Sequence, residues 1–288
     1  MKIWITGYKG MLGYDLVRTL NNNDYELILT DKNDVDITNL REIFEIVKEH
    51  EIDVIINASA YTDVDGSQTN KETAYDVNAI GAKNLAITSK KHDIKLIHIS
   101  SDYVFNGDKN KAYTENDEVD PINYYGETKL QGEKFIQKNM NRYFIIRTQW
   151  LYGINNGNFV KTMLRLAENN DEINVVNDQY GSPTFTKDLA MAIAELIKSE
   201  KYGLYHVTNS GECSWFEFAK LIFEIANINI ILNPVSTSQY PTPAKRPKYS
   251  VLSNEKWLSE GFKPLRSLKD SLNEYLNLEL SKSYNFNI

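Results

Sequence analysis

The sequence of 288 residues predicts an α/β protein with a doubly wound parallel sheet, followed by a smaller mixed α/β lobe. Three observations support this fold class. Short apolar runs alternate with segments of helical spacing through the first half of the chain, as in sheets covered by helices on both faces. A glycine-rich turn joins the first apolar run to the first helical segment. Beyond about residue 150 the alternation becomes irregular and turn-forming residues cluster.

Five apolar runs have the length and composition of buried strands. They are KIWIT (residues 2–6), ELILT (26–30), DVIIN (53–57), KLIHIS (95–100) and YFIIR (143–147). A helical segment separates each run from the next, so we expect parallel strands joined by right-handed crossovers. This alternation is typical of a Rossmann-type sheet.

Segments of helical spacing lie between these runs. We expect helices over residues 15–21, from about 38 to 49, over 71–92 and over 124–139. The hydroxyl of Thr38 can cap the second helix by accepting a hydrogen bond from a free backbone N–H. These helices provide the crossovers that a parallel sheet requires.

Turn-rich stretches divide the second half of the chain. They are GINNG (153–157), QYGSPT (179–184) and YPTPAKRP (240–247). Glycine and proline favour turns that interrupt regular elements. We therefore predict a first domain over residues 1–150 and a lobe formed mainly by residues 151–288, with a chain that can cross between them more than once.

The composition is that of a folded globular protein. Hydrophobic residues make up 42% and charged residues 25% of the chain, both ordinary values. A net charge of −7 disfavours binding to the phosphates of DNA or RNA. No run approaches the roughly 18 apolar residues of a membrane-spanning helix. Because Gly7 and Lys9 interrupt the apolar run at the N-terminus, we expect no signal peptide, no membrane partner and a cytoplasmic location.

The cysteine and histidine content argues against disulfides and zinc. Cys213 is the only cysteine, so it cannot form an internal disulfide, which fits a reducing compartment. We interpret it as a small core residue rather than a nucleophile. The four histidines show no zinc-type spacing, and we predict no metal site.

The turn ITGYKGMLG places Gly7, Gly10 and Gly13 between a strand and a helix. In that context a glycine-rich turn lets the backbone approach a dinucleotide pyrophosphate at a helix N-terminus. The spacing is GxxGxxG rather than the GxGxxG of most dehydrogenases. A turn without a ligand is the alternative interpretation.

Asp31 ends the second predicted strand, about 18 positions after Gly13. An acidic side chain in this place binds the ribose hydroxyls of adenosine. The carboxylate disfavours a 2′-phosphate, so NADH should be usable, while the adjacent Lys32 keeps NADPH possible. A solvated acid at a strand end is the alternative.

The run YYGETKL carries Tyr125 and Lys129 in the spacing Tyr-x-x-x-Lys. Four residues are about one helical turn, so on a helix both side chains reach one face. A nearby ammonium lowers the pKa of a phenol and suits it for proton transfer. Ser101 follows an apolar strand at the edge where α/β sheets bind ligands, so it can hold a carbonyl oxygen. Alone, a Tyr-x-x-x-Lys pair is more often part of a solvated helix face.

With these motifs the chain resembles the extended short-chain dehydrogenase/reductase family, and within it the dTDP-4-dehydrorhamnose reductases, almost end to end. The segments that carry the resemblance are ITGYKGMLG, NASAYTDVD, VNAIGAKNLA, ISSDYVFNG, PINYYGETKLQGE, RTQWLYG, NFVKTML, DQYGSPT, YHVTNSGECSWFEFA and YPTPAKRP. The resemblance implies a dinucleotide-binding first domain, a substrate-binding second lobe, and NADH or NADPH as the cofactor.

The resemblance also implies roles for individual residues. Ser101, Tyr125 and Lys129 would be catalytic, with Tyr125 as the proton donor. Residues expected at the cofactor are Gly7, Gly10, Met11, Leu12, Gly13, Asp31, Asp36, Ile37, Ala58, Ala60, Tyr61, Thr62, Asn78, Tyr125 and Lys129. Residues expected at the substrate are Ser101, Asp102, Trp150 and Arg246. A core position for Trp150 and a surface position for Arg246 are the alternatives.

The implied reaction is reduction of the C4 ketone of dTDP-4-dehydro-L-rhamnose to dTDP-L-rhamnose, the last step in making this donor for cell-surface polysaccharide. The implied partner is a nucleotide sugar, and the protein would be a monomer or a homodimer. Some relatives bind magnesium through glutamates at a dimer contact. Asp15 stands at one such position, and we predict no metal. Gln68 stands where family members commonly have glutamate, which we interpret as local variation away from the proton-transfer chemistry.

Two alternatives remain from the sequence. One is a reductase of another nucleotide-linked 4-ketosugar, or one with the opposite C4 stereochemistry. The other is a non-catalytic dinucleotide-binding protein, like the regulatory subunit of methionine adenosyltransferase. The presence of Ser101, Tyr125 and Lys129 together favours an enzyme.

Overall fold

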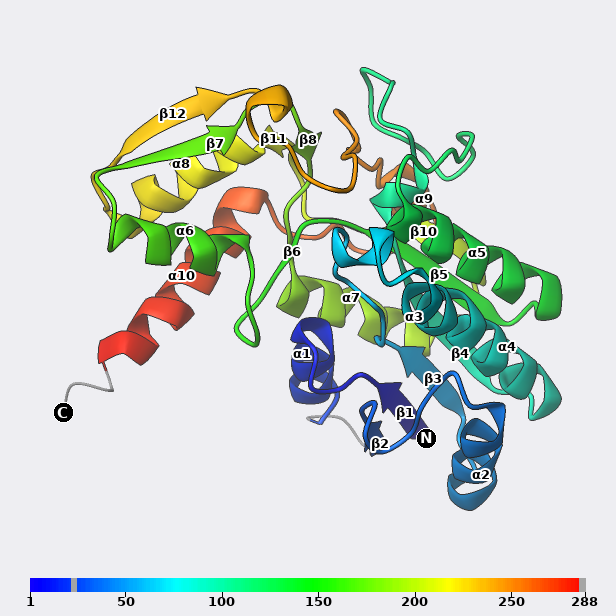
Figure 1. The fold of residues 1–288 in the computed structure, drawn as a ribbon. Coiled ribbons are helices and arrows are strands. Elements are labelled where there is room, and N and C mark those ends of the chain that lie inside the picture. Colours follow the sequence, from blue (N-terminus) through cyan, green and yellow to red (C-terminus); the bar gives the residue numbers. More distant parts are fainter. Residues whose placement is uncertain (22–24, 285–288) are drawn as a thin grey trace.

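A computed structural model describes residues 1–21 and 25–284, and it centres on a parallel sheet of six strands (Figure 1). In spatial order the strands are β10 (Gly203–His206), β5 (Tyr143–Thr148), β4 (Lys95–Ser101), β3 (Val54–Asn57), β1 (Lys2–Thr6) and β2 (Glu26–Thr30). The doubly wound fold class and the five predicted strands are confirmed. The chain order reverses between β1 and β3, the place where such sheets bind ligands.

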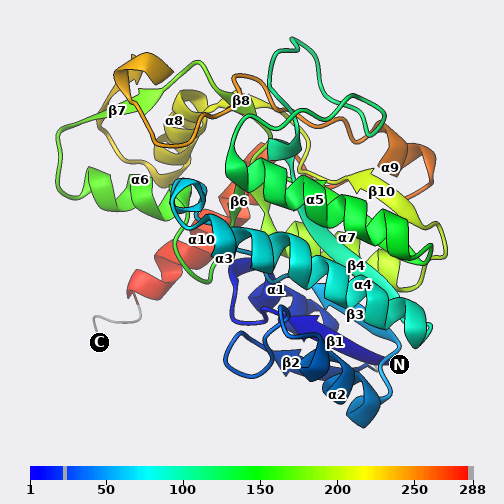
Figure 2. The ribbon, with the colours of Figure 1, turned by 45° about the vertical axis from the view of Figure 1, so that its right-hand side comes forward.

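Helices cover both faces of this sheet (Figure 2). On one face lie α1 (Met11–Leu20) and α7 (Thr186–Ile197), whose apolar side chains share a core with β1, β3 and β5. On the other face lie α2 (Leu40–His50), α4 (Gly81–Lys91) and α5 (Tyr124–Asn139). No helix among the described residues is long and apolar enough to span a bilayer.

Two details of the helices differ from the sequence prediction. The cap of α2 is Asn39, whose side chain accepts from the backbone N–H of Arg41, because the Thr38 hydroxyl instead donates to Asp36. The long helix predicted over residues 71–92 forms, but as α3 (Lys71–Tyr75), a π-helical turn over Asp76–Ile80, and α4. Such turns are often found at functional sites.

The second lobe is built from residues after β5. It contains β6 (Leu151–Tyr152) paired with β9 (Thr184–Phe185), β7 (Glu172–Val176) paired with β12 (Ile231–Val235), and β8 (Tyr180–Gly181) paired with β11 (Cys213–Ser214). Around these strands lie α6 (Phe159–Ala167), α8 (Trp215–Ala226) and α10 (Leu268–Tyr284), while α9 (Glu255–Ser259) lies near β10. β10 is a strand of the large sheet, and α7 packs on one face of it. We therefore propose that the second lobe consists of the remaining segments after residue 150.

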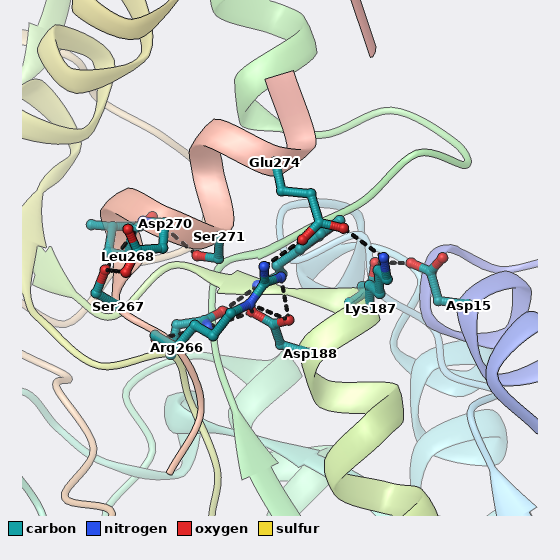
Figure 3. Close-up of polar contacts among 12 residues, drawn as sticks. Asp15, Lys187, Asp188, Arg266, Ser267, Leu268, Asp270, Ser271 and Glu274 are labelled. Carbon is teal, nitrogen blue, oxygen red and sulfur yellow. Dashed lines mark hydrogen bonds and ion pairs between the residues drawn. The ribbon is translucent and has the colours of Figure 1, made fainter. Parts of the chain in front are cut away.

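A charged network ties α10 of the second lobe to α7 of the first (Figure 3). Arg266 binds Asp188 at 2.6 Å, and Lys187 binds Glu274 at 2.5 Å. Arg266 also donates to Glu274, so the four charges alternate in sign along one chain of contacts. The side chain of Asp188 is only 1% exposed, and Asn209 is its second donor, at 2.7 Å.

We expect Arg266→Met to lower the free energy of unfolding by about 1–3 kcal/mol, because it leaves the buried Asp188 carboxylate without its guanidinium. Urea denaturation measures the change. The control is Arg41→Met, which removes an exposed partner of Glu45 and should leave stability nearly unchanged. Equal effects of the two substitutions would contradict a specific role for the network.

Candidate active site

Two adjoining cavities open at the carboxyl ends of the central strands. The first has a volume of about 540 Å³ and the second about 500 Å³. Five residues line both of them: Gly10, Ala58, Ser59, Ala60 and Asn156. The two cavities therefore form one continuous cleft.

The glycine turn forms the floor where the cavities meet. Gly7 has a left-handed φ of +69°, and its N–H donates to the carbonyl of Thr30. A Cβ on Gly13 would lie 2.2 Å from the carbonyl oxygen of Gly7, so only glycine allows this approach of helix and turn. Gly10 caps α1 without a side-chain hydrogen bond, which leaves the first helical N–H groups for a ligand.

This floor fits a dinucleotide. A helix N-terminus with uncapped N–H groups binds a diphosphate, and the absence of side chains lets the diphosphate approach the backbone. Met11 and Leu12, also predicted at the cofactor, line the second cavity. The residues present therefore fit the nicotinamide dinucleotide that the sequence predicts.

The first cavity ends in an acidic rim suited to adenosine. Asp31, Lys32, Asp36 and Ile37 all line it. The carboxylate of Asp31 accepts from the backbone N–H of Lys32 at 2.6 Å, which fixes it at the end of β2. Asp36 accepts from the backbone N–H and the hydroxyl of Thr38. The rim thus offers a carboxylate acceptor for ribose hydroxyls, as the sequence predicted for Asp31.

The loop after β3 forms the opposite wall, and Asn78 supports it from behind. Ala58, Ala60 and Tyr61 line the first cavity, and Thr62 lines the second. Asn78 is only 1% exposed and lines neither cavity. Its side chain accepts from the backbone N–H of Tyr61 and donates to the Tyr61 carbonyl and to Thr128. It therefore holds the loop against α5 and reaches a cofactor only through that loop.

Ser101, Tyr125 and Lys129 meet in the second cavity. Ser101 ends β4, while the other two lie one turn apart at the start of α5, which Asn123 caps through the N–H of Gly126. Gly126 is required here because a Cβ would lie 2.1 Å from the carbonyl oxygen of Tyr103. The three predicted catalytic side chains thus share one wall.

The hydroxyl of Tyr125 is a neutral acid in this environment. Burial raises the pKa of Tyr125, the charge of Asp102 raises it further, and a hydrogen bond with Ser101 opposes them. The expected lowering of this pKa below its ordinary value is not met, because burial outweighs the interactions that oppose it. Lys129 is itself buried, which lowers its pKa to about 8, and its ammonium donates to the carbonyl of Ile99 at 2.6 Å. A protonated phenol is the form required of a proton donor.

Asp102 lies beside Ser101 and joins it to the second lobe. Its carboxylate accepts from Ser101 at 3.0 Å and from the hydroxyl of Ser250 at 2.7 Å. Burial raises the pKa of Asp102 to about 6 against these hydrogen bonds. Asp102 also lines the second cavity, so its carboxylate can contact a ligand as well as Ser101.

The other two residues predicted at the substrate lie in different surroundings. Trp150 lines the second cavity. Arg246 is outside the cavity lining, and its guanidinium binds both carboxylate oxygens of Asp65, at 2.5 and 2.7 Å. A ligand phosphate would have to compete with Asp65 for this guanidinium.

Sequence reasoning missed further residues of the cleft. Trp215, Gln149 and Thr148 line the second cavity, and Asn156 lines both. The loop between β6 and α6 reaches the start of α1 (Figure 1), where Asn155 and Asn156 donate to the carbonyl of Lys9 at 2.8 and 3.1 Å. The turn signal GINNG was visible, but nothing in it indicated contact with the glycine turn.

Asp15, the position where some relatives place a metal ligand, lies outside this cleft. Its carboxylate accepts from the hydroxyl of Thr186 at 2.5 Å, and burial raises its pKa. The contact joins α1 to the start of α7. The prediction that the protein holds no metal stays a prediction.

The pKa of Lys129 leads to a testable pH dependence. Only the charged ammonium can stabilise a phenolate at Tyr125. Since the Lys129 pKa in the free protein is about 8, we expect kcat/KM to fall as the pH rises through that value. Initial rates at limiting substrate measure it. A rate that stays constant well above that pH would contradict a charged Lys129 in the reaction.

Comparison with known families agrees with this geometry. Residues 1–280 match the family model described as the RmlD substrate binding domain. The chain is 42% identical over 275 residues to a spore coat polysaccharide biosynthesis protein of Bacillus subtilis, covering 96% of each chain. It is 41% identical to a dTDP-4-dehydrorhamnose reductase of Aggregatibacter actinomycetemcomitans, covering 87% of this chain and 90% of the relative.

Solved structures show the same fold. A dTDP-4-dehydrorhamnose reductase of Clostridium acetobutylicum is 44% identical, with a TM-score of 0.95. Another from Bacillus anthracis, solved in complex with NADP, is 44% identical, with a TM-score of 0.94. Each comparison covers 96% of this chain and 99% of the other.

Proposed function

The chain belongs to the dTDP-4-dehydrorhamnose reductase family, and we propose that it reduces the C4 ketone of dTDP-4-dehydro-L-rhamnose to give dTDP-L-rhamnose. It is an NAD(P)H-dependent oxidoreductase. The observation that carries the proposal is the meeting of Ser101, Tyr125 and Lys129 in a cavity that continues into the glycine-turn cleft. A non-catalytic protein would have no need of this arrangement.

The geometry assigns a task to each residue. The cofactor, when bound along the glycine turn, supplies the hydride for C4 of the sugar. Tyr125 donates its phenolic proton to the oxygen at C4, and Ser101 holds that oxygen by a hydrogen bond as negative charge develops. Lys129, one turn along α5, stabilises the phenolate that remains at Tyr125. In the structure the Ser101 hydroxyl donates to Asp102, so it turns to the C4 oxygen when the sugar binds, while Ser250 keeps its own hydrogen bond to Asp102.

The location and partners follow as proposals from this reaction. A reaction that consumes reduced nicotinamide cofactor and a nucleotide sugar suits the cytoplasm, where both are made. We propose that the product serves as a rhamnose donor for cell-surface polysaccharide. The relative named for spore coat polysaccharide biosynthesis supports this use. We propose a monomer or a homodimer.

The test is a turnover assay with identified product. Purified protein is mixed with dTDP-4-dehydro-L-rhamnose and NADH or NADPH, and loss of the reduced-cofactor absorbance is followed. We expect oxidation with at least one cofactor, and dTDP-L-rhamnose by NMR. The epimer at C4 would overturn the stereochemical assignment. No oxidation by protein that demonstrably binds the cofactor would overturn the proposed substrate.

The acidic rim predicts how cofactor choice can be altered. We expect Asp31→Ser to raise the KM for NADH by about tenfold or more, because a charged acceptor for the ribose hydroxyls is lost. It should also lower the KM for NADPH, because the carboxylate no longer repels the 2′-phosphate. Steady-state kinetics with both cofactors measure the ratio.

The neighbouring side chain provides the control for Asp31. Lys32→Met should weaken NADPH use and leave NADH use unchanged, since Lys32 can attract only the additional phosphate. An unchanged ratio of the two cofactors in Asp31→Ser would show that Asp31 does not contact the ribose.

A further inference from the structure

The wall of the second cavity contains a pair of stacked indoles. Trp150 and Trp215 have ring centroids 3.5 Å apart and ring planes within 9° of parallel. Both line the cavity that holds Ser101 and Tyr125. Trp215 begins α8, whereas Trp150 follows β5, so the pair joins the two lobes at the site.

Trp150 is held in a conformation that its own backbone disfavours. Its φ is +49°, in the left-handed region that a bulky side chain rarely occupies. Such strain persists only where the surroundings impose it, and it clusters at ligand sites. A Cβ on Gly181 would lie 2.5 Å from Cε2 of Trp150, so the strand β8 lies directly against this indole.

Trp215 is fixed just as firmly. Ser214 caps α8 through a capping box with Glu217, and its hydroxyl donates to Asn177 at 2.6 Å. Phe159 of α6 packs on the Trp215 ring, with centroids 4.5 Å apart. The Trp215 indole is therefore held in place by α6 and α8, and it stacks on the Trp150 indole.

The position of Trp150 indicates which part of the substrate it faces. Thr148 pairs with Ser101 in the β4–β5 ladder, and Trp150 follows two residues later. The indole therefore lies close to the catalytic hydroxyls, at the end of the cleft where the sugar reacts. A 6-deoxy sugar has a methyl group and ring C–H groups that gain by burial against an apolar aromatic surface.

We propose that Trp215 is a positioning residue of the substrate site, which holds the Trp150 indole as a flat wall against the 6-deoxy sugar opposite Ser101 and Tyr125. The identity of the sugar rests on the proposed function. The stacked wall itself rests on the geometry alone. Trp215 acts through Trp150 and takes no part in hydride or proton transfer.

The first test compares Trp215→Leu with Trp215→Phe. We expect Trp215→Leu to raise the KM for dTDP-4-dehydro-L-rhamnose by about three- to tenfold, with the KM for NADH and kcat nearly unchanged. Trp215→Phe should restore most of the affinity, because a phenyl ring can still stack. The control is Trp257→Phe, a buried indole stacked on Phe262, which should leave both KM values unchanged.

The outcomes separate positioning from simple destabilisation. An unchanged sugar KM in Trp215→Leu, with wild-type thermal stability, would overturn the proposal. A uniform loss of kcat and of both affinities, together with a lower Tm, would also overturn it in favour of a purely structural role.

A binding measurement separates this proposal from the proposed function. The chain has four tryptophans, and Trp4 and Trp257 are at most 1% exposed, so a ligand at the stacked pair should dominate any change in emission. We expect dTDP-L-rhamnose, without cofactor, to change the emission of wild type more than that of Trp150→Phe, which retains Trp215 at the cavity. If dTDP-L-rhamnose does not change the emission but another dTDP-6-deoxysugar does, the proposed role of the stacked indoles is supported and the proposed substrate is wrong. If no dTDP-sugar gives a signal beyond that of dTDP, the wall is not at the sugar.

Discussion

Replacing Tyr125 by phenylalanine is expected to lower kcat by about 10²–10⁴-fold, because the substitution removes only the hydroxyl that donates the proton. The ring remains, and its edge-to-face contact with Tyr103, at 5.7 Å between centroids, should keep the cleft in shape. Cofactor binding should therefore change little. Turnover at saturating substrate, together with a dissociation constant for NADH, measures both properties.

The adjacent tyrosine provides a matched control for this prediction. Tyr124 begins the same helix but does not line the cavity; it lies under the ammonium of Lys71, 5.1 Å from the ring centroid. Tyr124→Phe should keep near-wild-type kcat. If both variants retained full activity, another group would have to supply the proton.

Breaking the buried ion pair beneath the catalytic helix is expected to cost about 3–5 kcal/mol of stability. Arg147 of β5 donates to both carboxylate oxygens of Glu133, at 2.9 and 2.7 Å, and the two side chains are 4% and 1% exposed. Arg147→Met would leave the Glu133 carboxylate buried, with the hydroxyl of Ser100 as a remaining donor. Urea denaturation followed by circular dichroism measures the loss.

Two further variants test the cause of this loss. Adding Glu133→Leu to Arg147→Met should recover much of the stability, because no unpaired charge is then buried. Lys220→Met, which removes an exposed partner of Glu224, should change stability by less than about 1 kcal/mol. A double variant that is much less stable than the single one would show that packing, not charge, is the dominant contribution of this pair.

The sheet was predictable because its strands are short and apolar on both faces. The five predicted strands form with boundaries within one residue. The sixth strand, β10, was missed because its sequence GLYH is short and lies within the irregular second half. Its pairing with β5 depends on tertiary contacts, which local periodicity does not reveal.

The helix caps and the π turn show the limits of local rules. Thr38 and Asn39 are both good capping residues, and the choice depended on Asp36, which accepts from the hydroxyl of Thr38. The π turn at Asp76–Ile80 has no signature in the apolar spacing. It is associated with Asn78, whose amide binds the backbone of Tyr61 and the side chain of Thr128.

The site was predictable where a motif carries its own geometry. Gly7 had to be glycine because its φ is left-handed, and Gly13 because the turn and α1 touch. Tyr125 and Lys129 had to share a face because one turn separates them. Trp215 and Asn156 enter the cleft from the second lobe. Their place depends on how that lobe packs against the sheet, which no motif spacing records.

The electrostatics of Tyr125 could not be derived from spacing either. The sequence indicates that Lys129 is near, but not that both side chains are buried and that Lys129 is directed at the carbonyl of Ile99. Burial then decides the direction of both pKa shifts. The result is a protonated tyrosine, the form that the predicted proton donor requires, although its pKa is raised and not lowered.

The central claim is that this cleft delivers a hydride to C4 of the sugar. Protein is incubated with dTDP-4-dehydro-L-rhamnose and NADH carrying two deuterium atoms at C4 of the nicotinamide, and the product is examined by NMR. The account predicts dTDP-L-rhamnose with deuterium at C4 of the sugar. A product without deuterium at C4, or an unreacted sugar with protein that binds NADH, would contradict it.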